Sequence, residues 1–169
     1  GAAGSSKNIQ ERKFFSAYPD RGNSSFYETQ SPEVSGNTSD EHFIVKEFSL
    51  NYLLSQIDFG RIDFIESIKI DTEGHDLEVI KGASRFMDRI LYFRIECFRG
   101  IYPNSEFAEK NKFPSHILFG TDGYVDSASA IIEYLKNYNF SLISTQPGDY
   151  VFLNEKLKYK LLNHQVYPG

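Results

Sequence analysis

The stretch FIESIKIDTEGHDLEVIKGA, residues 64–83, decides the fold of this chain. Its first part is an apolar run rich in isoleucine, which predicts a buried strand over residues 64–71. From about His75 to Asp88 the apolar residues recur at helical spacing, so a helix follows the strand. Gly82 interrupts this helix at a cost of about 1 kcal/mol relative to alanine, and we expect close packing of the helix on a sheet to explain it.

Further strands and helices are predicted on both sides of this stretch. The strands cover residues 11–18, 42–48, 90–98, 140–145 and 149–154, and the helices cover residues 49–56 and 128–138. Ser49 or Asn51 is the expected N-cap of the first helix, and Ser127 that of the second. The alternation of strands and helices predicts an α/β fold. A right-handed crossover makes the strands 64–71 and 91–97 parallel neighbours, and the last two strands add an antiparallel hairpin.

The composition bounds the class of protein. With 169 residues and 40% hydrophobic residues, the chain is long and apolar enough for one domain with its own core. A formal net charge of −5 gives no basic surface for nucleic acid. Every apolar run is shorter than a membrane helix requires, so we expect no membrane partner. The single cysteine, Cys97, cannot form an intrachain disulfide, which favours a reducing, cytoplasmic location.

Carboxylates gather where the central strand ends. Asp71 and Glu73 follow the apolar run, and Gly74 lets the chain turn sharply into the helix. Ligands of open α/β sheets bind outside the carboxyl ends of the strands. The two-residue period of an extended chain puts Asp71 and Glu73 on one side, and Glu96 ends the neighbouring strand. We therefore expect three carboxylates to converge at one edge of the sheet.

Each of these carboxylates also has a simpler structural explanation. Asp71 or Glu73 would serve as the N-cap of the helix that follows. Glu96 would equally form a structural ion pair with Arg94, with Arg99 or with a lysine. The functional and the structural interpretations both stand at this point.

The segment IKIDTEGHDLEVIKGA, residues 68–83, resembles the signature of FkbM-type methyltransferases, which use S-adenosylmethionine. The residues at the family's signature positions are Lys69, Ile70, Asp71, Glu73, Gly74, Asp76, Lys81, Gly82 and Ala83. YFRIECF, residues 92–98, is similar to the family's following strand, and GNSSF, residues 22–26, to its Ser-Ser segment. FSLNYLLSQ, residues 48–56, is similar to its Thr-Leu-Asp-x-Leu-Leu helix, with Asn51 where the family usually has Asp.

The resemblance implies a Rossmann-like methyltransferase sheet, mostly parallel, with a C-terminal antiparallel hairpin. It covers about residues 1–154, and we expect residues 155–169 to form a C-terminal tail. The glycine-rich loop and ribose-binding acidic residue of the first two strands of such enzymes have no counterpart here. The sequence therefore looks N-terminally incomplete, without the first one or two strand–helix units. An additional N-terminal segment or a partner chain would then complete the cofactor site.

The implied function is S-adenosylmethionine-dependent methylation of an oxygen or nitrogen of a small molecule or sugar. The candidate catalytic residues are Asp71, Glu73, Glu96 and His75, and the candidate cofactor-binding residues are Asp71, Ser24 and Ser25. His75 is a candidate general base, with a solvated first-turn residue as the simpler explanation. The serines are equally ordinary as turn residues.

Two other classes of function compete with methyl transfer. Asp71, Glu73 and Glu96 would suit a Mg²⁺ ion in a phosphoester hydrolase, although the methyltransferase interpretation needs no metal. A noncatalytic module would instead bind a glycan or a protein through the aromatic-rich residues 98–124.

Overall fold

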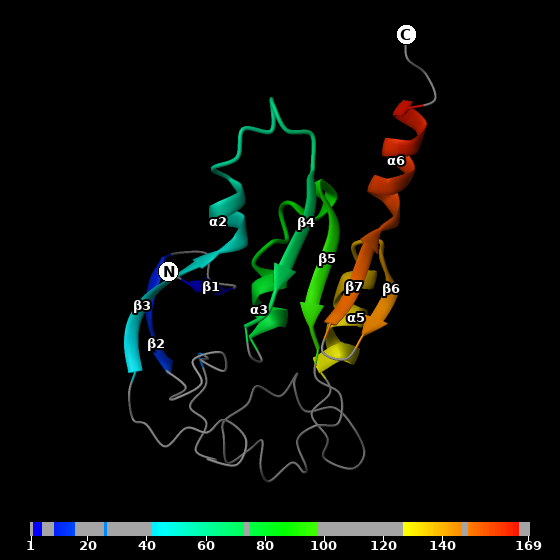
Figure 1. Cartoon of the computed structure of the whole chain (residues 1–169). Coiled ribbons are helices and arrows are strands. Elements are labelled where there is room, and N and C mark those ends of the chain that lie inside the picture. Colours follow the sequence, from blue (N-terminus) through cyan, green and yellow to red (C-terminus); the bar gives the residue numbers. More distant parts are fainter. Residues whose placement is uncertain are drawn as a thin grey trace.

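The computed structural model of the chain describes residues 2–4, 9–15, 26, 42–72, 75–97, 127–146 and 149–165. These residues form a mixed α/β structure with a three-stranded and a four-stranded sheet (Figure 1). The α/β class expected from the sequence is confirmed.

The four-stranded sheet has the order β4-β5-β7-β6. Its strands are β4 (Ile65–Ile70), β5 (Ile90–Glu96), β6 (Phe140–Gln146) and β7 (Asp149–Asn154). β4 and β5 are parallel neighbours, and β6 and β7 form the antiparallel hairpin, as the sequence predicts. β7 is also antiparallel to β5. β6, which is antiparallel to β7, therefore runs in the same direction as β4 and β5. Among the described strands of this sheet β7 alone is reversed, which agrees with the expected mostly parallel sheet with a C-terminal antiparallel hairpin.

The three-stranded sheet has the order β1-β3-β2. β1 (Ala2–Gly4) runs parallel to β3 (His42–Ser49), and β2 (Gln10–Phe15) runs antiparallel to it. The strands β2 and β3 lie where the sequence predicts strands, whereas β1 was not predicted. α2 (Leu50–Leu54) follows β3 directly, and the Ser49 hydroxyl accepts a hydrogen bond from the Tyr52 amide at 3.1 Å. Ser49 is thus the N-cap.

The helix after β4 is shorter than the sequence predicts. α3 spans Asp76–Lys81, and the chain then passes through turns to the 3₁₀ helix η2 (Met87–Arg89). β1 approaches the end of α3 closely: a Cβ atom on Gly82 would lie 2.2 Å from the Gly4 carbonyl oxygen. The expectation that Gly82 marks close helix-on-sheet packing is confirmed, and this contact joins the two sheets.

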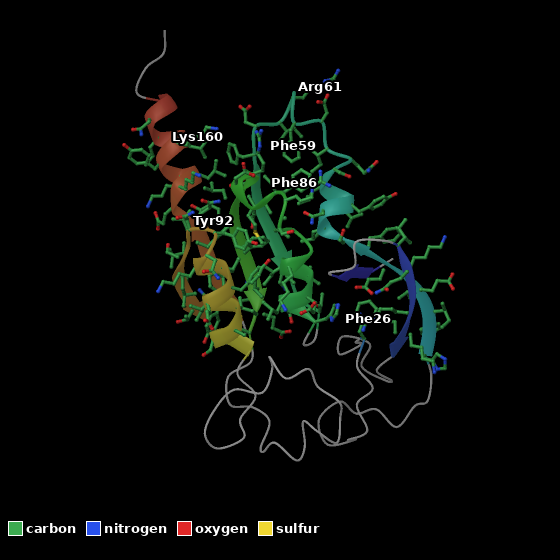
Figure 2. The ribbon with its side chains drawn as sticks, turned by 180° about the vertical axis from the view of Figure 1, so that it is seen from behind. Phe26, Phe59, Arg61, Phe86, Tyr92 and Lys160 are labelled. Carbon is green, nitrogen blue, oxygen red and sulfur yellow. The ribbon has the colours of Figure 1, made fainter. Side chains whose placement is uncertain are left out.

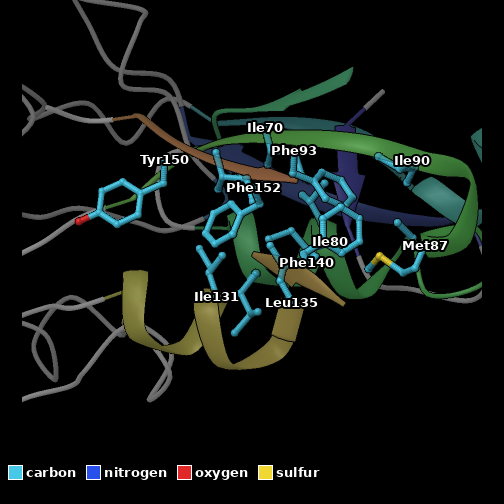
Figure 3. Close-up of a cluster of buried hydrophobic side chains, with 14 of the residues drawn as sticks. Ile70, Ile80, Met87, Ile90, Phe93, Ile131, Leu135, Phe140, Tyr150 and Phe152 are labelled. Atoms are coloured by element: carbon cyan, nitrogen blue, oxygen red, sulfur yellow. The ribbon is translucent and has the colours of Figure 1, made fainter. Parts of the chain in front are cut away.

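The core lies between the four-stranded sheet and the helices α3 and α5 (Ser127–Lys136). Figure 3 shows Ile131 and Leu135 of α5 pointing toward Phe140 and Phe152 of the hairpin. The Phe93 ring of β5 lies 5.2 Å from the Phe140 ring, between centroids. Each such buried side chain contributes about 1.5–3 kcal/mol to folding, so this layer supplies most of the stability.

The segment expected to be a tail contains a helix, α6 (Glu155–Gln165). Asn154, which is 2% exposed, accepts a hydrogen bond from the Leu157 amide at 3.0 Å and so caps α6. Its amide nitrogen donates to the carbonyl oxygens of Met87 and Ile90 at 2.8 and 3.1 Å. One buried asparagine therefore ties the end of β7 to the start of β5 and to α6.

Replacing Gly82 with alanine should lower the free energy of unfolding by about 1–3 kcal/mol, because the added methyl meets the backbone of β1. Without that contact, Gly→Ala in a helix would stabilise by about 1 kcal/mol. Gly60→Ala is the control, since its Cβ would meet only the flexible Asp58 carboxylate and should change stability by less than about 0.5 kcal/mol. Urea denaturation of both variants decides the sign, and a stabilised Gly82→Ala would contradict the close approach.

Candidate functional site

Two of the predicted site carboxylates meet where β4 and β5 end. Ile70 pairs with Ile95, which brings Asp71 next to Glu96 at the carboxyl ends of two parallel strands. Lys69 donates a hydrogen bond to Asp71 at 2.7 Å, and both side chains are exposed, to 53% and 42%. This hydrogen bond lowers the pKa of Asp71, and a further hydrogen bond with Glu96 lowers it too, against the opposing effect of burial. The expected convergence of Asp71 and Glu96 is confirmed.

A third carboxylate at this edge is one that the sequence analysis did not identify. Asp149, the first residue of β7, pairs in register with Glu96. Both Nε and Nη2 of Arg94 donate to its carboxylate, at 3.1 and 2.5 Å. Arg94 is therefore bound to Asp149, where the sequence suggested a pair with Glu96. We call Asp71, Glu96 and Asp149 the carboxyl edge.

Thr72, which follows Asp71, is held by the residues at the start of α3. Asp76 is 1% exposed, and its Oδ1 accepts hydrogen bonds from the amide and the hydroxyl of Thr72, both at 3.0 Å. The His75 amide donates to the Thr72 carbonyl oxygen at 3.4 Å. The N-cap position of α3 is His75, and Asp71 lies four residues before it. Asp76, rather than Asp71, therefore binds Thr72 at the start of α3. Asp71 is left exposed to solvent beside Lys69.

His75 is buried, with 3% of its surface exposed, rather than solvated as a first-turn residue would be. Its Nε2 lies 3.4 Å from Nη1 of Arg12 and 3.8 Å from Oε1 of Glu47, and its ring packs edge-on against Phe26 with the centroids 4.9 Å apart. Burial and then the Arg12 charge lower the pKa of His75 to about 4. The imidazole is consequently neutral at pH 7 and would be a weak general base there.

Glu47 and Arg12 are residues that sequence reasoning missed. Glu47 of β3 is 1% exposed, and Ser49, two residues further along the strand, is also buried. The two-residue period of the strand was a usable signal, because it places a carboxylate in the inward-facing series. Arg12 lies at the edge of this group with 30% of its side chain exposed.

The other predicted site residues lie outside the part of the chain that the structure describes. These are Glu73, Ser24 and Ser25, together with Arg99 and the aromatic-rich residues 98–124. Within the described ranges, no group of three His, Cys, Asp or Glu side chains is arranged to hold a metal ion. No described helix is long and apolar enough to cross a membrane.

Two cavities lie at the opposite end of the sheet, beside α6. Their volumes are about 490 and 400 Å³, and both are lined by Leu157 and Lys160. Figure 2 shows Lys160 on α6, far from Phe26 beside the three-stranded sheet. These cavities adjoin Asn154 and Arg89, near the start of β5, and carry no carboxylate pair at the ends of parallel strands. The chemistry therefore points to the carboxyl edge rather than to these two cavities.

Comparison with known families gives one match. The family model Methyltransferase FkbM domain matches residues 3–142. The matched region runs from β1 into β6, and it includes Asp71, Glu96 and the buried group around His75. No curated protein and no solved structure matches the chain.

The low pKa of His75 should make the protein less stable as the pH falls. The pKa of His75 is about 6.5 in the unfolded chain and about 4 in the folded protein. Above pH 6.5 the histidine is neutral in both states. Between pH 6.5 and pH 4 only the unfolded chain binds the proton, which favours unfolding. This group alone should lower the free energy of unfolding by about 2 kcal/mol between pH 7.5 and pH 5. His75→Gln should remove that part of the pH dependence in urea denaturation. The same slope in both proteins would contradict a buried neutral His75.

Proposed function

The chain belongs to the FkbM methyltransferase domain family, and we propose that it transfers a methyl group from S-adenosylmethionine to an oxygen or nitrogen of a small molecule or sugar. The family match confirms the resemblance drawn from residues 68–83 and supports a methyltransferase role. The single observation that carries the proposed site is the pairing of Asp71 with Glu96 at the carboxyl ends of β4 and β5. The cofactor, the acceptor class and a cytoplasmic location are proposals.

The residues of the carboxyl edge fit such a cofactor. S-adenosylmethionine supplies an electrophilic methyl group on a positively charged sulfur and presents ribose hydroxyls. Ionised carboxylates accept hydrogen bonds from hydroxyl groups and attract positive charge. Asp71 is held ionised by Lys69 and is substantially exposed, so it is able to receive a ligand at the end of its strand.

The low pKa of Asp71 decides which role suits it best. General-base catalysis is most efficient when the pKa of the base lies near the operating pH. The hydrogen bond from Lys69 moves the pKa of Asp71 away from that range. We therefore assign Asp71 to binding and orientation rather than to proton removal. Such a role is sufficient for methyl transfer, because bringing the reactants into line accounts for most of the lowering of the barrier.

The competing functions have less support. A Mg²⁺-dependent hydrolase would need its carboxylates free for the ion, whereas Lys69 binds Asp71 and Arg94 binds Asp149. No described cluster of three suitable ligands exists. The noncatalytic alternative depends on residues 98–124, outside the described ranges, and nothing observed favours it.

Replacing Asp71 with asparagine in the full-length protein should weaken S-adenosylhomocysteine binding about tenfold or more, the value of a hydrogen bond to a charged group. Calorimetric titration measures the dissociation constant directly. Asp63→Asn is the matched control, because it makes the same change on an exposed side chain before β4 and should leave binding unchanged. An Asp71→Asn protein that binds like the wild type would remove Asp71 from the cofactor site, and a wild type that does not bind would overturn the proposed function.

A further inference from the structure

The proposed chemistry leaves Glu47 without a role, although it is among the most buried charged side chains in the described part of the chain. It lies on β3, the middle strand of the three-stranded sheet. Its Oε2 accepts hydrogen bonds from Nε2 of Gln10 at 2.7 Å and Nη1 of Arg12 at 3.3 Å, both from β2. Its Oε1 occupies the space beside Gly4, where a Cβ atom would lie only 1.6 Å away. The strand β1 therefore needs glycine at this position to admit the carboxylate.

The same carboxylate faces the side chain that begins α3. Oε1 of Glu47 lies 3.8 Å from Nε2 of His75, and Nη1 of Arg12 lies 3.4 Å from the same nitrogen. The Arg12 guanidinium stacks over the Phe26 ring at 4.3 Å, and that ring in turn packs on His75. The imidazole is thus enclosed by groups from β2, from β3 and from Phe26.

Only three residues separate His75 from Asp71 of the carboxyl edge in the sequence. Its amide donates to the Thr72 carbonyl oxygen, and Thr72 is bonded through its amide and hydroxyl to Asp76, the residue after His75. Thr72 directly follows Asp71. A shift of the His75 side chain would therefore be transmitted to Thr72, next to Asp71.

Stability alone is a poor explanation for the ion pair between Arg12 and the buried Glu47. The cost of removing two charges from water often equals or exceeds their attraction, and apolar replacements of similar volume are often neutral or stabilising. A buried charged network that is fully hydrogen-bonded does, however, fix one arrangement of its neighbours. The network around Glu47 lies between the three-stranded sheet and the start of α3, so the neighbours whose arrangement it would fix are His75 and, through it, Thr72.

We propose that Glu47 is a positioning residue of the methyltransferase site: it holds the His75 imidazole at the start of α3 and thereby sets the position of Thr72, which follows Asp71. The inference rests on the proposed function, because the position of Thr72 matters only if a ligand binds at the carboxyl edge. Glu47 itself is enclosed by Gln10, Arg12 and Gly4 and does not reach the solvent at that edge.

The first test is the pKa of His75, followed by NMR in wild type and Glu47→Gln. The described charged groups that act on His75 are Arg12 of β2, Glu47 of β3 and Glu78 of α3. Because the Glu47 charge raises the pKa of His75, its removal should lower that pKa below the wild-type value of about 4. A merely structural role, in which the substitution loosens packing and admits water, would instead raise the pKa toward 6.5. That result would overturn the proposal.

The second test is S-adenosylhomocysteine binding by the full-length protein. Glu47→Gln should weaken binding about fivefold, whereas Glu66→Gln, the same change at an exposed position of β4, should not. Wild-type binding in Glu47→Gln would overturn the positioning role and leave the proposed function standing. A wild type that does not bind would overturn both. If Glu47→Gln does not fold, Arg12→Gln removes the other half of the pair from a partly exposed position; weaker binding supports the proposal and unchanged binding overturns it.

Discussion

The parallel pairing of β4 with β5, in the register that places Ile70 beside Ile95, is the constraint on which the rest of the structure depends. Side chains alternate across a strand, so this register sends Ile70 and Ile95 into the core and Lys69 and Arg94 to the solvent. The same register ends both strands together and so brings Asp71 beside Glu96. A slip by one residue would exchange the two faces, and the burial of the isoleucines therefore also specifies the geometry of the carboxyl edge.

The charges of the molecule organise the site more than they stabilise the fold. In each of the pairs Lys69–Asp71 and Arg94–Asp149 at least one side chain is substantially exposed to solvent. Exposed ion pairs contribute about 0–1 kcal/mol each to stability. Burial of a single side chain such as Phe93 contributes more than either pair. What the pairs do is hold the carboxylates of Asp71 and Asp149 in place at the end of the sheet. Gln10 and Arg12 likewise hold the buried Glu47 carboxylate in place beside His75.

Local patterns predict the main elements well, because the strands β4 and β5 and the hairpin are visible as apolar runs separated by turns. The signature segment likewise identifies Asp71, and the order of strands identifies Glu96. The failures all involve contacts between distant residues. α3 ends at Lys81, and no local pattern reveals the approach of Gly4 to Gly82 beside that end.

The same limit applies to the helix and the charged residues that sequence reasoning missed. α6 forms where Asn154 caps it and Leu157 is buried, although the segment is polar enough to look like a tail. Glu47 follows the inward-facing period of its strand, but its partners Arg12 and His75 lie 35 and 28 positions away in the sequence. Glu47, Arg12 and His75 meet only because the three-stranded sheet packs against α3.

The most direct test of the central claim is to map where S-adenosylhomocysteine binds, by following backbone amide resonances of the full-length protein during a titration. We expect the shifts to concentrate at the carboxyl edge, in residues 69–77, 94–97 and 149. Shifts concentrated instead around Leu157 and Lys160, where the cavities beside α6 lie, would contradict that claim.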